Sequence, residues 1–195
     1  MSRGRGYKKA DPYTRRAKAQ GYAARSVFKL EEIVERCGLL NPGDRVVDLG
    51  CYPGSWSRLA SERIEPGALV GVDLSEPQGI PGTFIARSVY EVEPAELLDA
   101  LGGPADLLMS DMAPPTTGDR KGDHLRQIAL AERALWLASA VVRPGGAFIA
   151  KVFEGADAQA FFEQVRAGYA TARRIKPKAT RQQSVEFFVV GQGRQ

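Results

Sequence analysis

The chain has 195 residues, of which 44% are hydrophobic and 26% charged, a composition typical of one globular domain with its own core. No apolar run approaches the ~18 residues needed to cross a bilayer, and the first ten residues lack the apolar stretch of a secretory signal, so we expect a cytoplasmic protein without a membrane span. The two cysteines, Cys37 and Cys51, show no pairing or CxxC pattern, which argues against a disulfide scaffold or a zinc site.

The net charge of +4 is distributed unevenly along the chain. Residues 1–29 contain nine Lys or Arg against one acid, residues 30–165 contain 11 basic and 21 acidic side chains, and residues 166–182 contain six basic side chains and no acid. Basic ends of this kind favour a polyanion-binding surface, and the interleaved Tyr7, Tyr13 and Tyr22 are able to stack on bases. We expect residues 1–25 to form a basic RNA-binding arm and residues 26–195 one domain. A tail that only aids solubility is the alternative.

The first helix is predicted from Ser26 to Cys37. Its apolar residues have helical spacing, Ser26 suits the N-cap and Gly38 the end, and Lys29 lies exposed near its start. Short aliphatic runs then alternate with helical stretches. The predicted strands are 45–49, 68–73, 83–86, 105–110, 147–152, 172–175 and 185–190, and the predicted helices are 55–64, 94–101, 123–142 and 157–167.

This alternation predicts the fold class. Strands without polar alternation, separated by helices, indicate a parallel sheet covered on both faces, which is a doubly wound α/β domain. Residues 177–184 are too few for a crossover helix, so the last two strands should form an antiparallel hairpin at the end of the sheet.

A glycine-rich turn follows the first predicted strand, in the segment DLGCYPGSW. Gly50 and Gly54 let the backbone turn tightly toward a ligand, and Pro53 stiffens the turn. Trp56 opens the next helix, where core packing and cofactor contact are equally plausible roles. Asp73 ends the second strand, 23 residues after Gly50, close to the offset at which an acid binds a ribose diol. Turn and acid together indicate an adenosine-containing cofactor.

Three ionisable residues lie where parallel strands end or where a strand is otherwise apolar: Asp111, Lys151 and Glu186. Burying such groups is costly unless they have partners, so their convergence on one sheet edge indicates a reactive site, although each alone suits a solvated strand end. The remaining candidate residues give weaker evidence of a functional site. His124 is predicted at the surface and Trp136 in the core, and no divalent-metal cluster is visible.

Four segments, FKLEEI, DLGCYPGSWS, SDMAP and KVFEG, resemble the FtsJ/RrmJ family of ribose 2′-O-methyltransferases over nearly the whole chain. The resemblance implies a Rossmann-like S-adenosylmethionine-dependent methyltransferase fold, with a mostly parallel seven-stranded sheet that ends in an antiparallel hairpin. It implies S-adenosylmethionine as cofactor. It implies as substrate a uridine of large-subunit (23S) ribosomal RNA, in the assembled 50S subunit, and we expect a monomer.

The family pattern of lysine, aspartate, lysine and glutamate falls here on Lys29, Asp111, Lys151 and Glu186. By this resemblance Lys151 accepts the proton of the 2′-hydroxyl, Asp111 orients Lys151 and complements the methyl-sulfonium charge, and Lys29 and Glu186 bind the ribose and balance charge. The implied cofactor-binding residues are Gly50, Pro53, Gly54, Trp56, Asp73 and Asp111.

The chain departs from the family in two places. Cys51, Tyr52 and Ser55 replace small residues or glycine in the first loop. Ser88 stands where many members have the acid that contacts the adenine, which puts that contact in question.

Several other functions stay open at this point. The chain suits a 2′-O-methyltransferase of another RNA, such as tRNA or an mRNA cap, or a non-catalytic RNA-binding α/β module. A NAD-linked dehydrogenase would share the fold, but the GxGxxG turn is missing. An amino-group methyltransferase would need an aromatic residue near Thr116 to stack a flipped base.

Overall fold

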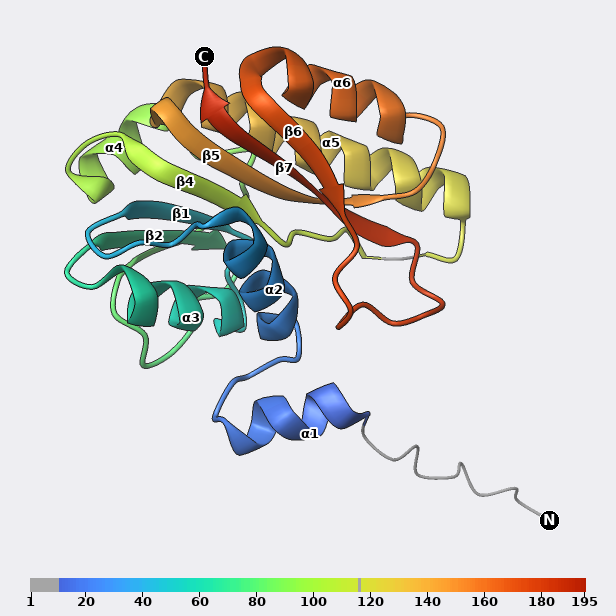
Figure 1. Cartoon of the computed structure of the whole chain (residues 1–195), viewed down its shortest axis with the longest axis horizontal. Coiled ribbons are helices and arrows are strands. Elements are labelled where there is room, and N and C mark those ends of the chain that lie inside the picture. Colours follow the sequence, from blue (N-terminus) through green and yellow to red (C-terminus); the bar gives the residue numbers. More distant parts are fainter. Residues whose placement is uncertain (1–10, 116) are drawn as a thin grey trace.

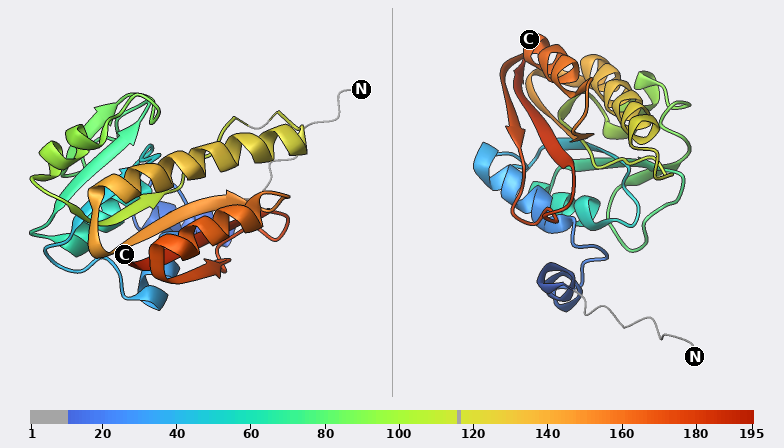
Figure 2. Two further views of the ribbon diagram at one scale, coloured as in Figure 1. Left: turned by 90° about the horizontal axis from the view of Figure 1, so that it is seen from above. Right: turned by 90° about the vertical axis from the view of Figure 1, so that its right-hand side faces the viewer.

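A computed structural model describes residues 11–115 and 117–195. Its helices are α1 (Pro12–Ala19), α2 (Val27–Cys37), α3 (Ser55–Ile64), α4 (Pro94–Leu101), α5 (Arg120–Val141) and α6 (Ala158–Gly168). Its strands are β1 (Arg45–Leu49), β2 (Ala68–Asp73), β3 (Thr83–Ala86), β4 (Ala105–Ser110), β5 (Val142–Phe153), β6 (Tyr169–Ile175) and β7 (Glu186–Arg194). The strands form one sheet between two layers of helices, with α2 and α3 on one face and α4, α5 and α6 on the other (Figures 1 and 2).

The strand order is β3-β2-β1-β4-β5-β7-β6, and every pair is parallel except those of β7. The predicted α/β class, the seven strands and the antiparallel hairpin are therefore confirmed. β7 lies between β5 and β6, because it pairs with β5 on one side and with β6 on the other. The order reverses between β1 and β4, and at such a point the carboxyl ends of the strands leave a crevice for a ligand.

Both faces of the sheet are apolar, which explains why the strands read without polar alternation. Phe148 and Ile149 are neighbours on β5 and point to opposite faces, yet both are fully buried. Phe148 packs in the core beneath α4, α5 and α6, whereas Ile149 packs with Phe188 beneath α2 and α3. Covering both faces orders the central strands, whose ends carry the polar side chains.

The residues expected to form an arm contain a helix that was not predicted. The Asp11 carboxylate accepts the backbone N–H of Thr14 at 3.1 Å and so caps α1, with Pro12 in the first turn. Tyr13 packs against Phe28 at the start of α2, with 5.8 Å between ring centroids. Residues 1–10 of the expected arm lie outside the described residues. Within the rest of the arm, α1 packs on the domain.

Ser26 precedes α2 as predicted, but its side chain makes no capping hydrogen bond. The predicted end at Gly38 is confirmed, since that residue is left-handed with φ +65°. β5 begins five residues earlier than expected, at Val142.

For two side chains on α5 the observed burial is the opposite of the predicted one. His124 is buried, because the spacing 124, 127, 128, 131 places it on the helix face that packs on the domain. Its Nε2 accepts the backbone N–H of Asp157 at 3.1 Å. Trp136 is 47% exposed, since Ala134, Leu137 and Ala138 form the buried face at this end of the helix.

Candidate active site

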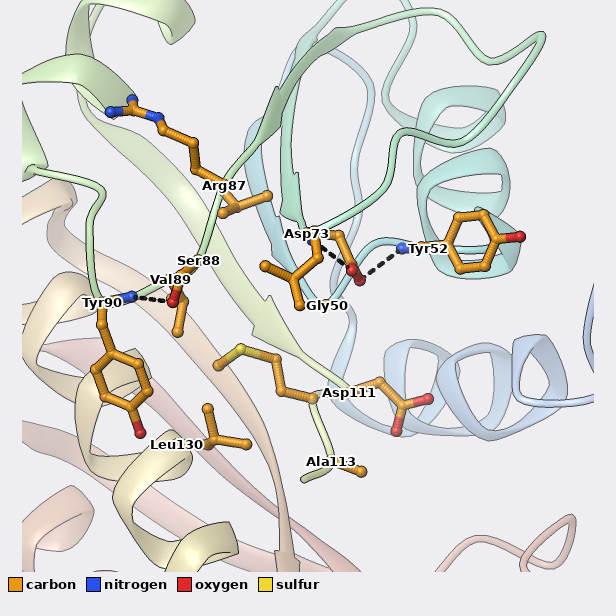
Figure 3. Close-up of a pocket in the computed structure, with 13 residues that line it drawn as sticks. Gly50, Tyr52, Asp73, Arg87, Ser88, Val89, Tyr90, Asp111, Ala113 and Leu130 are labelled. Carbon is orange, nitrogen blue, oxygen red and sulfur yellow. Dashed lines mark hydrogen bonds between the residues drawn. The ribbon is translucent and has the colours of Figure 1, made fainter. Parts of the chain in front are cut away.

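A first cavity of about 430 Å³ opens at the carboxyl ends of β1, β2, β3 and β4 (Figure 3). Its size lies in the range of small-molecule sites, ~300–1,000 Å³. Its lining includes Gly50 and Tyr52 after β1, Asp73 at the end of β2, Arg87 and Ser88 after β3, and Asp111 after β4. The cavity therefore lies at the reversal of strand order.

Gly50 brings the backbone after β1 close to this cavity. Its φ of +80° is left-handed, and its N–H donates to the carbonyl of Val72 at 2.8 Å. A Cβ at this position would lie 2.7 Å from Cγ of Met112, which also lines the cavity. Only glycine fits, so the loop and the segment after β4 lie in direct contact.

Asp73 is bound by backbone groups that fix its carboxylate at the rim. Oδ2 accepts the N–H of Tyr52 at 3.0 Å and Oδ1 that of Leu74 at 2.7 Å (Figure 3). Each carboxylate oxygen keeps a further lone pair, which suits it to accept hydrogen bonds from a diol. Ser88 also lines the cavity, and its Oγ accepts the N–H of Tyr90 at 3.3 Å, so its hydroxyl proton remains available.

Three of the predicted cofactor residues do not line this cavity. Pro53 and Gly54 line a separate one of about 490 Å³ beside α3. The indole of Trp56 is buried, donates from Nε1 to the carbonyl of Ser26 at 2.9 Å and packs against Phe188. Of the two roles left open for the Trp56 side chain, the structure places it in core packing.

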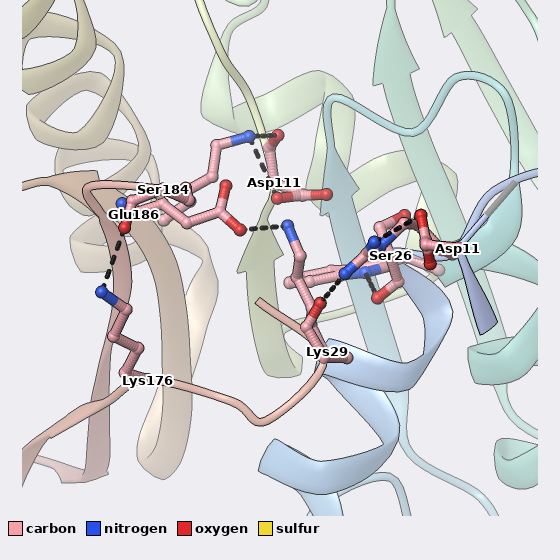
Figure 4. Close-up of polar contacts among 11 residues, drawn as sticks. Asp11, Ser26, Lys29, Asp111, Lys176, Ser184 and Glu186 are labelled. Carbon is pink, nitrogen blue, oxygen red and sulfur yellow. Dashed lines mark hydrogen bonds and ion pairs between the residues drawn. The ribbon is translucent and has the colours of Figure 1, made fainter. Parts of the chain in front are cut away.

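The structure brings the four charged residues together from four elements. On β5, Lys151 is 7% exposed, and its Nζ donates to the carbonyl of Asp111 at 2.5 Å and lies 3.0 Å from Asp111 Oδ1. Lys29 on α2 forms an ion pair with Glu186 on β7, and Figure 4 shows this pair beside Asp111. Phe188 pairs with Lys151 across the strands, so Glu186, two residues away on β7, points to the same face as Lys151.

Two further buried polar residues, Gln127 and Asp48, were not identified from the sequence. Gln127 on α5 is buried and donates from Nε2 to the carbonyl of Lys151 at 2.8 Å. Asp48 on β1 is fully buried, and one of its oxygens accepts the hydroxyl of Ser57 at 2.6 Å. Burial raises the pKa of Asp48 to about 7, against the hydrogen bond from Ser57, and the nearby charges of Asp111 and Asp73 raise it too. The one sequence signal that could have revealed Asp48 is the presence of a carboxyl inside the strand segment RVVDL.

Within residues 11–115 and 117–195, no cluster of His, Cys, Asp and Glu is arranged to bind a metal ion. The helices of the same residues include none that is long and apolar enough to cross a membrane.

Similarity to known proteins extends over most of the chain. Residues 22–194 match the model of the FtsJ-like methyltransferase family. A Paramagnetospirillum magneticum protein named Ribosomal RNA large subunit methyltransferase E is 44% identical over 191 residues, which cover 94% of this chain and 78% of the relative. A Desulfatibacillum aliphaticivorans protein of the same name is 43% identical over 185 residues, covering 93% and 89%.

A solved structure shares the fold. It is a Plasmodium falciparum protein described as a ribosomal RNA methyltransferase, 24% identical, with a TM-score of 0.78 over 89% of this chain and 98% of that one. The family match covers residues 22–194, which include Lys29, Asp111, Lys151 and Glu186. The chain belongs to the FtsJ-like methyltransferase family.

Proposed function

We propose that the protein transfers a methyl group from S-adenosylmethionine to the ribose 2′-hydroxyl of a uridine in large-subunit ribosomal RNA. The observation that carries the proposal is the pairing of Lys151 with Asp111 and of Lys29 with Glu186 beside a cavity that ends at Asp111. The names of the bacterial relatives support the substrate. The assembled large subunit (50S), a cytoplasmic location and a monomeric state belong to the same proposal.

The residues of the first cavity fit S-adenosylmethionine. Asp73 would bind the ribose diol, Ser88 the adenine edge in place of the family acid, and Asp111 would face the positively charged sulfonium. Gly50 leaves the backbone close enough to contact the cofactor. Pro53, Gly54 and Trp56 would act by shaping the loop from outside the cavity. When bound, the cofactor supplies an electrophilic methyl group.

Lys151 would act as general base toward the 2′-hydroxyl. A ribose hydroxyl is a weak nucleophile while protonated, so a neutral Lys151 amine must accept its proton as the oxygen attacks. Asp111 would orient that amine, because Nζ already contacts both its carbonyl and its carboxylate. Lys29 and Glu186 would bind the ribose, and the charge of each would be balanced by the other.

The decisive experiment maps 2′-O-methylation in RNA from cells that lack this protein. We expect one uridine of large-subunit ribosomal RNA to lose its methyl group, and expression of the wild-type chain to restore it. Purified protein should transfer label from methyl-labelled S-adenosylmethionine to large subunits from the same cells. Loss of a methyl group from tRNA or an mRNA cap instead, with large-subunit RNA unchanged, would refute the proposed substrate. Absence of label transfer to any RNA would favour a non-catalytic RNA-binding module.

A further inference from the structure

A second cavity, of about 410 Å³, contains the ion pair that the first cavity does not reach. The first cavity ends at Asp111, whereas Lys29 and Glu186 line the second. Its remaining walls come from the segment before α2, with Arg25 and Ser26, and from residues 176–185, which we call the β6–β7 loop. The cluster of four charged residues therefore borders two separate cavities.

The chemistry of the second cavity suits an anionic, hydroxyl-rich ligand. Three cationic side chains line it, Arg25, Lys29 and Arg181. Lys29 pairs with Glu186 and Arg25 with Asp11, so Arg181 carries the excess positive charge. The Oγ of Ser184 accepts the N–H of Glu186 at 3.3 Å, which leaves its hydroxyl proton free to donate. Cations and hydroxyl donors together match the phosphates and sugar oxygens of RNA, which receive most protein contacts in nucleic-acid complexes.

The walls of this cavity are tied together by hydrogen bonds and ion pairs. The Arg25 guanidinium forms an ion pair with Asp11, the cap of α1, at 2.7 Å and also donates to the carbonyl of Ala179 in the β6–β7 loop. The same loop is bound to α2, because the N–H of Lys178 donates to Glu32 Oε2 at 2.7 Å. The loop is therefore ordered against α1 and α2 before any ligand arrives, which lowers the entropic cost of binding.

Arg181 is the cationic side chain of this cavity that is available to bind an anionic ligand. It lies in a turn closed by the N–H of Ser184, which donates to the Arg181 carbonyl at 2.9 Å, while Lys176 donates to the Ser184 carbonyl at 3.0 Å (Figure 4). The side chain of Arg181 is exposed, and among residues 11–115 and 117–195 it has no ion-pair partner. The turn thus presents an uncompensated guanidinium beside the Lys29–Glu186 pair.

We propose that the second cavity receives the target nucleotide and that Arg181 contacts a phosphate next to its ribose. This inference rests on the proposed function, because it brings the 2′-hydroxyl to the charged cluster from the second cavity while the cofactor occupies the first. Arg15 and Lys18 are also exposed on α1, the helix that Asp11 and Arg25 join to the cavity, and are able to contact flanking phosphates. Arg25 then has a positioning role, since its guanidinium is engaged by Asp11 and Ala179.

The test compares Arg181→Ala with Arg166→Ala, which removes the same charge from α6 on the opposite face of the sheet. For Arg181→Ala we expect KM for unmodified large subunits to rise roughly five- to tenfold, with kcat and the Kd of S-adenosylmethionine near wild type. The slope of log Kobs against log[KCl], measured on a large-subunit RNA transcript, should become less negative by about one, the change expected when one phosphate contact is lost. Arg166→Ala should match wild type.

The outcomes separate this inference from the function on which it rests. If wild type methylates large subunits but Arg181→Ala equals Arg166→Ala in KM and in salt slope, the cavity does not bind the RNA backbone. If wild type transfers no methyl group yet Arg181→Ala still loses RNA affinity and salt dependence, the proposed reaction is wrong and the RNA contact stands. An equal Tm for both variants would show that neither result comes from unfolding.

Independently of the second cavity, one arginine on α5 shapes the wall of the first. Arg133 donates from Nε to the carbonyl of Val89 at 3.0 Å and from Nη2 to the carbonyls of Val92 at 2.7 Å and Tyr90 at 3.5 Å. Its guanidinium also stacks on Trp136, 4.3 Å from the ring centroid. Val89 and Tyr90 line the first cavity, so a single side chain fixes three carbonyls of the turn that follows β3.

We also infer that Arg133 is a positioning residue for the cofactor. By binding residues 89–92 it keeps Ser88 facing the cavity, and this too rests on the cofactor assignment above. Without the guanidinium the turn would lose a fork of donors that lysine cannot reproduce. The cofactor would then have to order the turn as it binds, so affinity falls while the chemical step is unaffected.

Calorimetry with S-adenosylhomocysteine and steady-state kinetics test this role. We expect Arg133→Ala to raise Kd and the KM of S-adenosylmethionine roughly tenfold with kcat nearly unchanged, and Arg133→Lys to recover only part of the affinity. Arg166→Ala again serves as the charge control. A wild-type Kd in Arg133→Ala, or a loss confined to kcat, would refute the inference. No measurable affinity in wild type would instead refute the cofactor assignment itself.

Discussion

Replacing Lys151 by alanine is expected to lower kcat for methyl transfer by about 10²–10⁴-fold, the usual contribution of a general base. The amine is the one group of the cluster that both contacts Asp111 and is able to take up the hydroxyl proton. Kd for S-adenosylmethionine and KM for large subunits should stay within about threefold of wild type, because Lys151 acts in the transition state rather than in binding.

A second variant, Lys151→Arg, distinguishes proton transfer from charge balance. Arginine keeps the positive charge and can still pair with Asp111, but its guanidinium is not deprotonated in proteins. If Lys151 is the base, the arginine variant is as inactive as the alanine variant. Near-normal activity of Lys151→Arg would mean that the residue only neutralises Asp111, and the proton would then need another acceptor. Both rates should be single-turnover rates, so that product release does not mask the chemical step.

The fold was predictable because the sequence pattern follows from burial on both faces. The aliphatic runs of β1, β2 and β4 have no polar alternation, and the structure packs helices against both of their sides. The insertion of β7 between β5 and β6 was not predictable, since pairing partners are set by tertiary contacts rather than by local pattern. The short helix α1 was missed for a related reason: its only buried residue is Ala17, so its apolar face is too small to detect.

The residues of the reactive site were likewise predictable only in part. Asp111, Lys151 and Glu186 were identified from their positions in or after the strands, and the family resemblance added Lys29 and the roles of all four. The ligand-facing loop was harder to assign, because a glycine-rich turn has two sides. Gly50 faces the first cavity, while Gly54 lines the separate cavity beside α3.

The supporting residues could not be predicted from the sequence, because their role depends on contacts across the domain. Arg133 and Gln127 lie on α5 yet bind carbonyls of segments more than 20 residues away in sequence. The helical spacing did contain the positions of His124 and Trp136. Tracing the buried face of α5 from residue 124 to residue 138 would have placed the first inside and the second outside.

A large effect on the pH dependence of stability is expected from Asp48, because it is a carboxyl inside the core whose pKa lies near neutrality. It is fully buried, and Oδ1 has no hydrogen-bond partner among the described residues. Its pKa of about 7 in the folded state compares with an ordinary value of 3.8. Between these values the folded protein retains a proton that the unfolded chain has released, so stability falls as pH rises through this window. Over roughly three pH units the loss from this one group is about 4 kcal/mol.

Replacing Asp48 by asparagine should remove that loss, because the amide is similar in size and stays neutral at every pH. Between pH 5 and pH 8 the unfolding free energy of wild type should fall by about 3 kcal/mol more than that of Asp48→Asn, measured by urea denaturation. Comparing the two changes cancels any fixed cost of the buried amide. Asp99→Asn, an exposed substitution on α4, should keep the wild-type dependence. Parallel curves for wild type and Asp48→Asn would show that the carboxyl is ionised in the core at neutral pH. In that case the charge beneath the Gly50 loop would add to those of Asp73 and Asp111 around the cationic cofactor.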